Sequence, residues 1–179
     1  MASVEGNMTE RMTRFREGVE VASARYMEVG DWAAVVELAR GLDDEPLVVG
    51  AALARDLAAD GVEAGVLRVP DVDSPLEVAD APVGLVRGVL GVAETGSVLL
   101  VEPSLSERVV SMLCHILVQG IARESIVDSL DDFAAWMQAH AVESPYATLT
   151  TGPSRTADIE RELTIGVQGP REVVVVVVG

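Results

Sequence analysis

The stretch "REVVVVVVG", residues 171–179, decides the fold of this chain. Its six consecutive valines lack the polar and apolar alternation of a half-exposed antiparallel strand, so both faces of the strand are expected to be buried. The stretch is far shorter than the roughly 18 apolar residues that a membrane-spanning helix needs. We therefore predict a central strand in a parallel or mixed sheet.

Upstream segments supply the neighbours that such a strand needs. Residues 46–69 predict a β-α-β unit, with "PLVVG" and "VEAGVLRV" as strands around the helix "ALARDLAAD". The span 83–102 predicts two strands around a turn at residues 93–96. Further strands are predicted at 115–120, 125–127 and 147–151, and helices at 104–114 and 128–140. This alternation predicts an α/β fold, a three-layer α/β/α sandwich with helices on both faces of the sheet.

The N-terminal segment carries an amphipathic stripe. Its apolar side chains alternate at spacings of four and three, which predicts a helix that Gly30 ends; they are Met8, Met12, Phe15, Val19, Ala22 and Tyr26. A second helix is predicted at 31–40, with Asp31 as its N-cap and Gly41 beyond its end. We expect residues 1–45 to pack as a helical segment on an α/β domain at 46–179, and removal of residues 1–28 to leave the sheet folded.

Composition excludes several classes of function. The 179 residues suffice for one core, and 13 basic against 29 acidic residues give a net charge of −16, which repels nucleic acid and anionic lipid. All the basic residues are arginine, so a catalytic lysine is excluded. The single cysteine, Cys114, cannot supply an iron–sulfur cluster or a structural zinc site. The polar first twenty residues lack a signal peptide's apolar core, so a cytoplasmic protein without membrane insertion is expected.

The stretch "TLTTGPSRTADIE", residues 148–160, is the first candidate site. It predicts a strand, a turn at Gly152 and a helix that Ser154 caps and that begins near Thr156. In that geometry Arg155 and free backbone N–H groups hold a carboxylate or phosphate at the carboxyl edge of the sheet. The alternative is a plain capped helix start, because acids in the first turn already satisfy the helix dipole.

A second candidate is the turn in "GVAETGSVLL", residues 91–100. Glu94 can act there as a base, a nucleophile or a ligand to a substrate hydroxyl, or it is part of a solvated turn. His115, at the head of a strand, is either a proton carrier or a hydrogen-bonded structural residue. His140 is expected to cap a helix end. Two histidines in such positions predict no His-rich metal centre, and no metal is expected.

Taken together, "GVAETGSVLL" and "TTGPSRTADIERELTIGVQGP", residues 150–170, resemble the lactate-utilisation protein C family, the LUD domain. The resemblance spans roughly residues 46–178. It implies a NagB/RpiA/CoA-transferase-like fold, to which the N-terminal helices predicted from the apolar stripe are added. It also implies membership in an iron–sulfur system that oxidises L-lactate to pyruvate.

The residue patterns and the resemblance together give the candidate site residues. Glu94 and His115 are the candidate catalytic residues. The candidate residues for binding an anion or substrate are Thr95, Gly96, Ser97, Gly152, Ser154, Arg155, Thr156, Asp158 and Gln168. Gln168 stands where the family has a histidine, and glutamine keeps hydrogen bonding but does not titrate.

Three functions follow from these features. The first is a supporting, non-redox component of lactate oxidation that binds a partner subunit or a small organic anion. It has no cofactor of its own, and iron–sulfur clusters are expected only in the partner subunits. The second is an autonomous enzyme resembling a CoA-transferase or sugar-phosphate isomerase, with Glu94 as base or nucleophile. The third is a structural or regulatory module that forms a homo-oligomer through the N-terminal stripe.

Overall fold

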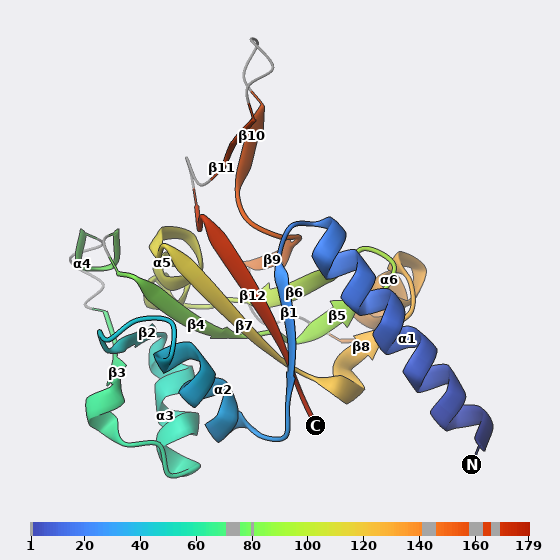
Figure 1. The fold of residues 1–179 in the computed structure, drawn as a ribbon, viewed down its shortest axis with the longest axis horizontal. Coiled ribbons are helices and arrows are strands. Elements are labelled where there is room, and N and C mark those ends of the chain that lie inside the picture. Colours follow the sequence, from blue (N-terminus) through green and yellow to red (C-terminus); the bar gives the residue numbers. More distant parts are fainter. Residues whose placement is uncertain (1, 71–75, 80, 141–145, 158–162, 166–168) are drawn as a thin grey trace.

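A parallel sheet forms the centre of the computed structural model (Figure 1). The structure describes residues 2–70, 76–79, 81–140, 146–157, 163–165 and 169–179. Within these residues the sheet has six strands in the order β1-β12-β7-β4-β2-β3, and all its paired neighbours are parallel. Their bounds are Arg25–Val29 (β1), Glu172–Val178 (β12), Ile116–Ala122 (β7), Val83–Arg87 (β4), Leu47–Val49 (β2) and Leu67–Arg68 (β3).

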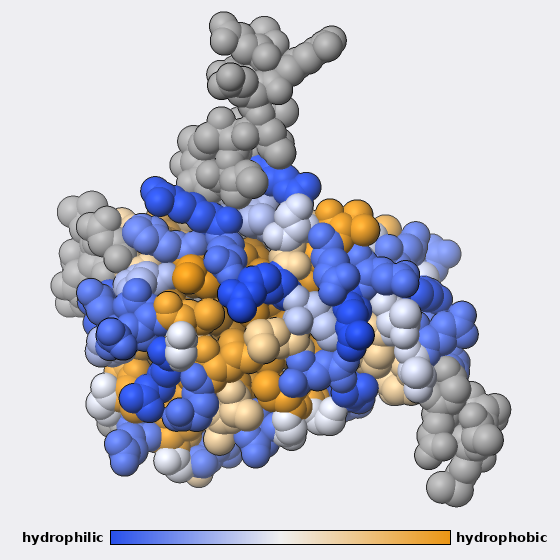
Figure 2. Space-filling model, viewed as in Figure 1, coloured by the Kyte–Doolittle hydropathy of each residue, from blue (hydrophilic) through white to orange (hydrophobic). Residues whose placement is uncertain are grey.

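Helices cover both faces of this sheet. The helices α2 (Trp32–Arg40) and α3 (Ala51–Ala59) contribute to one apolar core, and α1 (Ala2–Val21) and α5 (Leu105–Leu113) contribute to the other. The predicted α/β architecture with helices on both faces is therefore confirmed. Figure 2 shows hydrophobic surface gathered near the middle of one face of the molecule, framed by hydrophilic side chains.

The strand β12 lacks alternation of polar and apolar residues because both of its faces are buried. Val173, Val175 and Val177 pack in the core on the side of α1 and α5. Val174, Val176 and Val178 pack in the core on the side of α2 and α3. Because β1 and β7 pair with its two edges, β12 is surrounded by protein on every side. The predicted central strand is confirmed.

Most predicted local signals are also confirmed. The Asp31 carboxylate accepts a hydrogen bond from the Ala34 N–H at 2.8 Å and caps α2. Ser104 forms a capping box with Glu107 at the start of α5. His140 follows the last residue of α6 (Leu130–Ala139), and its N–H donates to the Trp136 carbonyl at 3.0 Å.

The N-terminal stripe differs from the predicted single helix. The helix α1 ends at Val21, and the backbone at Ser23 turns with a φ of 62° into strand β1. The Tyr26 ring nevertheless contacts Phe15 edge to face at 6.3 Å between ring centres, so both side chains border the same core. The helical spacing of apolar residues therefore extends past the end of α1 to Tyr26, because β1 runs back along the same core that α1 covers.

A second sheet lies on the side of α1 and α5. Within the described residues it contains β8 (Ile126–Val127), β5 (Leu90–Val92), β6 (Ser97–Val101) and β9 (Ala147–Thr150), in that order. The span 83–102 therefore holds three strands, where two were predicted. The chain changes sheets at Gly88, whose N–H bonds the Gly120 carbonyl in β7, and Val89, whose N–H bonds the Leu99 carbonyl in β6.

The remaining elements are short. They are α4 (Leu76–Ala79), the 3-10 turns Ala64–Val66 and Arg123–Ser125, and a hairpin of β10 (Arg155–Ala157) and β11 (Leu163–Ile165). The hairpin projects from the body at the top of Figure 1. Across the described parts of the chain, none of the helices has the length and apolar character to span a bilayer.

Candidate functional site

The acidic turn at residues 93–96 packs directly against α1. Gly96 has a φ of 67°, a conformation that glycine adopts readily. A Cβ on Gly96 would lie 2.2 Å from both the carbonyl carbon of Gly18 and the amide nitrogen of Val19. The close approach requires glycine, and it fixes the turn on the C-terminal half of α1.

Glu94 reaches from this turn to the helix α6. Its Oε2 accepts a hydrogen bond from the Leu130 N–H at 2.9 Å, and its own N–H donates to the Asp128 carbonyl at 3.1 Å. Leu130 is the first residue of α6, where a carboxylate is stabilised by the positive end of the helix dipole. The Glu94 side chain is exposed to solvent and held by α6.

A chain of hydroxyl groups joins the acidic turn to the strand that precedes the signature loop. The Ser97 Oγ lies 2.7 Å from the Thr95 Oγ1 and 2.6 Å from the Thr151 Oγ1. Next to it, the Gln119 side chain in β7 donates to the Thr150 Oγ1 at 2.9 Å. Ser97 and Gln119 are buried, so these contacts fix β9 to both sheets.

The signature loop, residues 152–155, meets the C-terminal end of α1. Gly152 has a φ of 68°, and a Cβ there would lie 2.2 Å from the Ala22 carbonyl oxygen. The Arg155 guanidinium donates a hydrogen bond to that same oxygen. Carbonyls at the end of a helix lack intrahelical partners, so Arg155 satisfies one of them.

The predicted helix after this loop is wrong. Arg155, Thr156 and Ala157 form strand β10, which pairs antiparallel with Leu163–Ile165. The backbone groups that were expected to be free at a helix N-terminus are on a strand, and Thr156 faces Thr164 in the pairing register. The prediction failed because a partner strand several residues further along the chain outweighs the local capping signals. Asp158 and Gln168 lie outside the described residues.

The predicted position at the carboxyl edge is also wrong. The Ser154 N–H donates to the Pro170 carbonyl at 3.2 Å, just before β12 begins, and Ala22 lies just before β1 begins. The loop therefore lies at the amino edge of the central sheet. The carboxyl-edge rule does not apply, because β9 belongs to the second sheet and the next described element along the chain is the strand β10.

His115 lies at the same amino edge. Its N–H donates to the Ala81 carbonyl at 3.0 Å, and its carbonyl accepts from the Arg171 N–H at 2.9 Å. These bonds join the beginnings of β7, β4 and β12. The structure thus places His115 and Ser154 on either side of the segment that enters β12, whereas Glu94 is bonded to α6.

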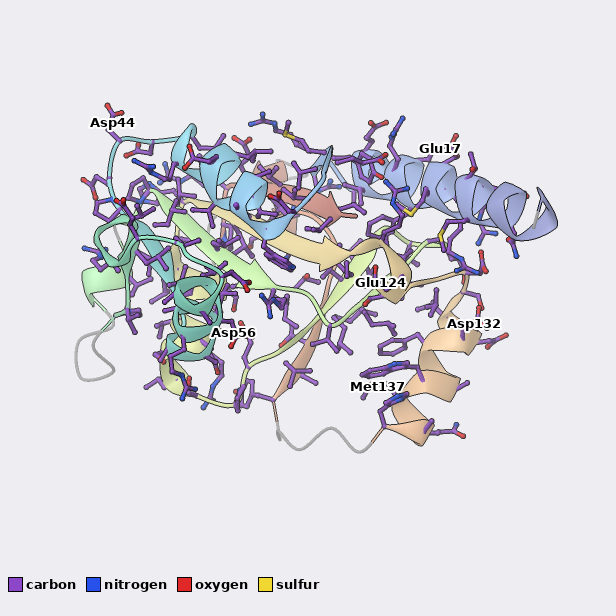
Figure 3. The ribbon with its side chains drawn as sticks, turned by 90° about the horizontal axis from the view of Figure 1, so that it is seen from below. Glu17, Asp44, Asp56, Glu124, Asp132 and Met137 are labelled. Atoms are coloured by element: carbon purple, nitrogen blue, oxygen red, sulfur yellow. The ribbon has the colours of Figure 1, made fainter. Side chains whose placement is uncertain are left out.

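An open groove of about 700 Å³ lies between α1 and the acidic turn. It is lined by Arg14, Glu17, Gly18, Val21, Ala22, Ala93, Glu94, Thr95 and Thr151. Glu17 is labelled on α1 in Figure 3. Val21 is 82% exposed and lines this groove. The sequence did not predict that α1 forms one side of this groove. The spacing of apolar residues in α1 shows which side of the helix is buried, but not which element lies beside its polar residues.

Asp128, beside the groove, was also missed. Its Oδ2 accepts from the Arg11 Nε at 3.0 Å and Nη2 at 2.6 Å, and these hydrogen bonds lower the pKa of the carboxyl. The Arg14 Nη2 donates to the Asp128 carbonyl at 2.7 Å. These contacts fix α1 on the segment between β8 and α6. In the described parts of the chain, no three His, Cys, Asp or Glu side chains are grouped to hold a metal ion.

Comparison with known proteins gives a family match and several relatives. The model of the LUD domain matches residues 60–178. Lactate utilization protein C of Geobacillus sp. (strain WCH70) is 34% identical over 103 residues, which are 55% of this chain and 42% of that protein. Lactate utilization protein C of Bacillus subtilis (strain 168) is 34% identical over 94 residues, 50% of this chain and 39% of that protein. The matches thus span about two fifths of these relatives.

Among solved structures, a DUF162 family protein from Deinococcus radiodurans has a similar fold. The TM-score is 0.66 at 20% sequence identity, and the match covers 96% of this chain and 98% of that one. At this identity the likeness concerns the fold alone. It extends over both sheets and the N-terminal elements, since almost the whole chain is covered.

Proposed function

Because the chain belongs to the LUD domain family, we propose that it serves lactate utilisation as a supporting component without a redox centre of its own. The observation that carries the proposal is the match to relatives named Lactate utilization protein C. Since the chain spans less than half of their length, their role is transferred here as a hypothesis about the shared domain.

Electron transfer is assigned to partner subunits that carry iron–sulfur clusters. This chain has one cysteine, and burial raises the pKa of the Cys114 thiol to about 12. The thiol is 1% exposed, and its Sγ would lie 2.7 Å from a Cβ on Gly84. Such a thiol stays protonated at neutral pH and packs as an apolar group, so it supports a division of labour between subunits.

The groove beside α1 is the surface that we assign to the partner subunit. Arg155 and Glu94 already bond Ala22 and Leu130, so neither side chain needs a ligand to satisfy it. Val21 is 82% exposed and lines the groove beside Ala22, so we assign to it an apolar contact with the partner subunit. A small organic anion at Arg155 is the alternative occupant, and it would compete with the Ala22 carbonyl for the guanidinium.

Growth on lactate tests the proposal. We expect deletion of the gene in its own organism to abolish growth on L-lactate and to leave growth on glucose unchanged. Reintroduction of the parent chain restores growth, whereas Val21→Asp weakens it, because a charge at the groove disfavours an apolar contact. The exposed, conservative change Glu63→Gln is the control. Equal growth on both carbon sources after deletion would show that the proposal is wrong.

Purification tests the partner. The tagged parent chain is expected to retain proteins that contain iron and acid-labile sulfide, and Val21→Asp is expected to retain less of them. Lactate oxidation by the retained proteins should fall when this chain is removed. If the isolated chain oxidises lactate unaided, the division of labour is wrong.

A further inference from the structure

A second pocket lies where the chain order of the central sheet reverses. From β2 the sheet continues to β3 on one side, whereas β4, β7 and β12 follow on the other side. In open α/β sheets such a reversal opens a crevice beyond the carboxyl ends of the two strands, and ligands bind there. A pocket of about 190 Å³ occupies this position, lined among others by Gly50 after β2, Arg87 at the end of β4 and Glu102 after β6.

Glu102 carries a buried carboxyl without a full set of partners. The residue is 4% exposed, and its Oε1 is buried with no hydrogen-bond partner among the described residues. Burial raises the pKa of this carboxyl. An unpaired buried polar atom is costly, and native structures retain few of them. A ligand that donates a hydrogen bond would remove this cost.

Arg87 presents a complementary group in the same pocket. Its Nη1 donates to the Asp56 Oδ2 at 3.0 Å, and its guanidinium carbon lies 4.3 Å from the centre of the Trp32 ring. Asp56 is labelled on α3 in Figure 3. These two contacts fix the guanidinium, while its Nε is buried and has no partner in the described parts of the chain.

The charges of the pocket select the ligand. Three carboxyls, those of Asp56, Glu102 and Glu107, face one guanidinium, so a bound carboxylate or phosphate would be repelled. An ammonium ion cannot accept a hydrogen bond from Arg87 and would lie beside its charge. A hydroxyl group can either donate or accept, so the hydroxyl groups of a ligand suit both kinds of unpaired atom.

We propose that this pocket binds a small uncharged hydroxyl compound, which donates a hydrogen bond to Glu102 and accepts one from Arg87. Apolar side chains, including Leu53, Leu85 and Leu100, line the rest of the pocket and contact the carbon atoms of the ligand. The volume of about 190 Å³ is below the roughly 300–1,000 Å³ of pockets for drug-sized ligands, so a compound of a few carbon atoms fits. The site is separate from the groove beside α1 and does not depend on the function proposed there.

Three compounds with one carbon skeleton test the class of ligand. Propane-1,2-diol, L-lactate and 1-amino-2-propanol share the CH₃–CHOH– unit and differ in bearing a hydroxyl, a carboxylate or an ammonium group. We expect the diol to shift the amide NMR signals of Gly50 and Arg87 in the full chain at neutral pH. Lactate should bind at least about tenfold more weakly, because its carboxylate is repelled by the surplus of carboxyls in the pocket. The amine should also bind more weakly than the diol, because its ammonium group cannot accept the hydrogen bond from Arg87 and lies beside the guanidinium charge, which offsets the attraction of the carboxyls. Stronger binding of lactate or the amine, or no shift with the diol, would overturn the proposal.

Two variants locate the site. Glu102→Met keeps the length of the side chain and removes the unpaired oxygen, so its thermal midpoint should equal or exceed that of the parent while diol binding is lost. Arg87→Lys keeps the charge and removes Nε, and it should weaken the diol about tenfold. Glu63→Met, an exposed control outside the pocket, should leave binding unchanged. If Glu102→Met binds the diol as the parent does, Glu102 is not a ligand group and the proposal fails.

Discussion

Arg155 illustrates how a motif residue acquires its contacts from distant parts of the chain. The sequence predicts a guanidinium beside free N–H groups, which is an anion site. In the structure it caps the C-terminal end of α1 at the Ala22 carbonyl, 133 residues away in the sequence. No pattern within residues 148–160 indicates that partner. The partner of Arg155 therefore depends on packing between distant segments, and its role in binding an anion stays a prediction.

Arg155→Ala separates a structural from a ligand-binding role. If the helix cap dominates, we expect a loss of about 1 kcal/mol in the free energy of unfolding, the usual scale of a hydrogen bond. Thermal and urea unfolding measure the loss, and Arg155→Lys should recover part of it. Calorimetry with lactate, pyruvate and phosphate completes the test. Unchanged stability together with lost anion binding would contradict the structural role.

Gly96→Ala tests the close approach of the acidic turn to α1. The Cβ would overlap backbone atoms of Gly18, so we expect a loss above about 3 kcal/mol, more than backbone strain of 1–3 kcal/mol alone accounts for. Gly61→Ala is the matched control, because Gly61 has a φ of 90° and nothing within 4 Å of the new Cβ. Urea unfolding compares the two. Equal losses would mean that strain alone, and not packing on α1, makes glycine necessary.

At the scale of elements, the sequence correctly predicted those helix ends and strands that depend on contacts or burial within the segment itself. The caps of α2, α5 and α6 are contacts within three or four residues, so sequence spacing suffices to place them. The strand β12 was predicted because burial on both faces leaves a direct compositional mark. The strands β1 and β10 were not, since each depends on a partner strand that local propensity does not specify.

The contact between α1 and Asp128 makes part of the stability depend on pH. The Arg11 hydrogen bonds lower the pKa of Asp128 in the folded protein, so this contact stabilises the fold above the unfolded value of about 3.9 and fades as the pH falls below it. Asp128→Asn should therefore be less stable than the parent near pH 7, by under about 1 kcal/mol because the pair is partly exposed. The difference should shrink below about pH 4. A difference that stays constant from pH 7 to pH 3 in urea unfolding would exclude this contribution.

At the scale of the whole molecule, the two edges of the central sheet hold different candidate sites. The signature loop and His115 lie at the amino edge, while Glu102 and Arg87 lie at the carboxyl end of the chain reversal between β2 and β4. Sequence motifs selected the residues that lie at the amino edge, but they placed the loop at the carboxyl edge. The site at the carboxyl end depends on strand order, which no sequence motif indicates. It also depends on the burial of Glu102, and the sequence around this acidic residue does not predict that burial.

The N-terminal segment contributes to the core, although the sequence predicted that the sheet would fold without residues 1–28. Phe15 and Val19 are 0% exposed in the core beneath α1, and burial of such side chains contributes roughly 1.5–3 kcal/mol each. The strand β1 also covers one edge of β12 over residues 174–178. The free energy of unfolding of a domain is only about 5–15 kcal/mol, so the loss of these contacts is comparable with the total stability.

Deletion of residues 1–28 is therefore expected to unfold the central sheet, contrary to the expectation from the sequence. The deletion removes α1 and most of β1, exposes the apolar edge of β12, and leaves the turn at Gly96 without the helix on which it packs. Near-ultraviolet circular dichroism and dispersion of amide NMR signals measure folding, and size-exclusion chromatography measures association. Deletion of residues 1–7 is the control, because it keeps the buried residues Met12, Phe15 and Val19. A monomeric product of the longer deletion with dispersed signals would show that β12 can form the edge of a stable sheet, and would restore the view of residues 1–45 as a segment packed on an independent domain.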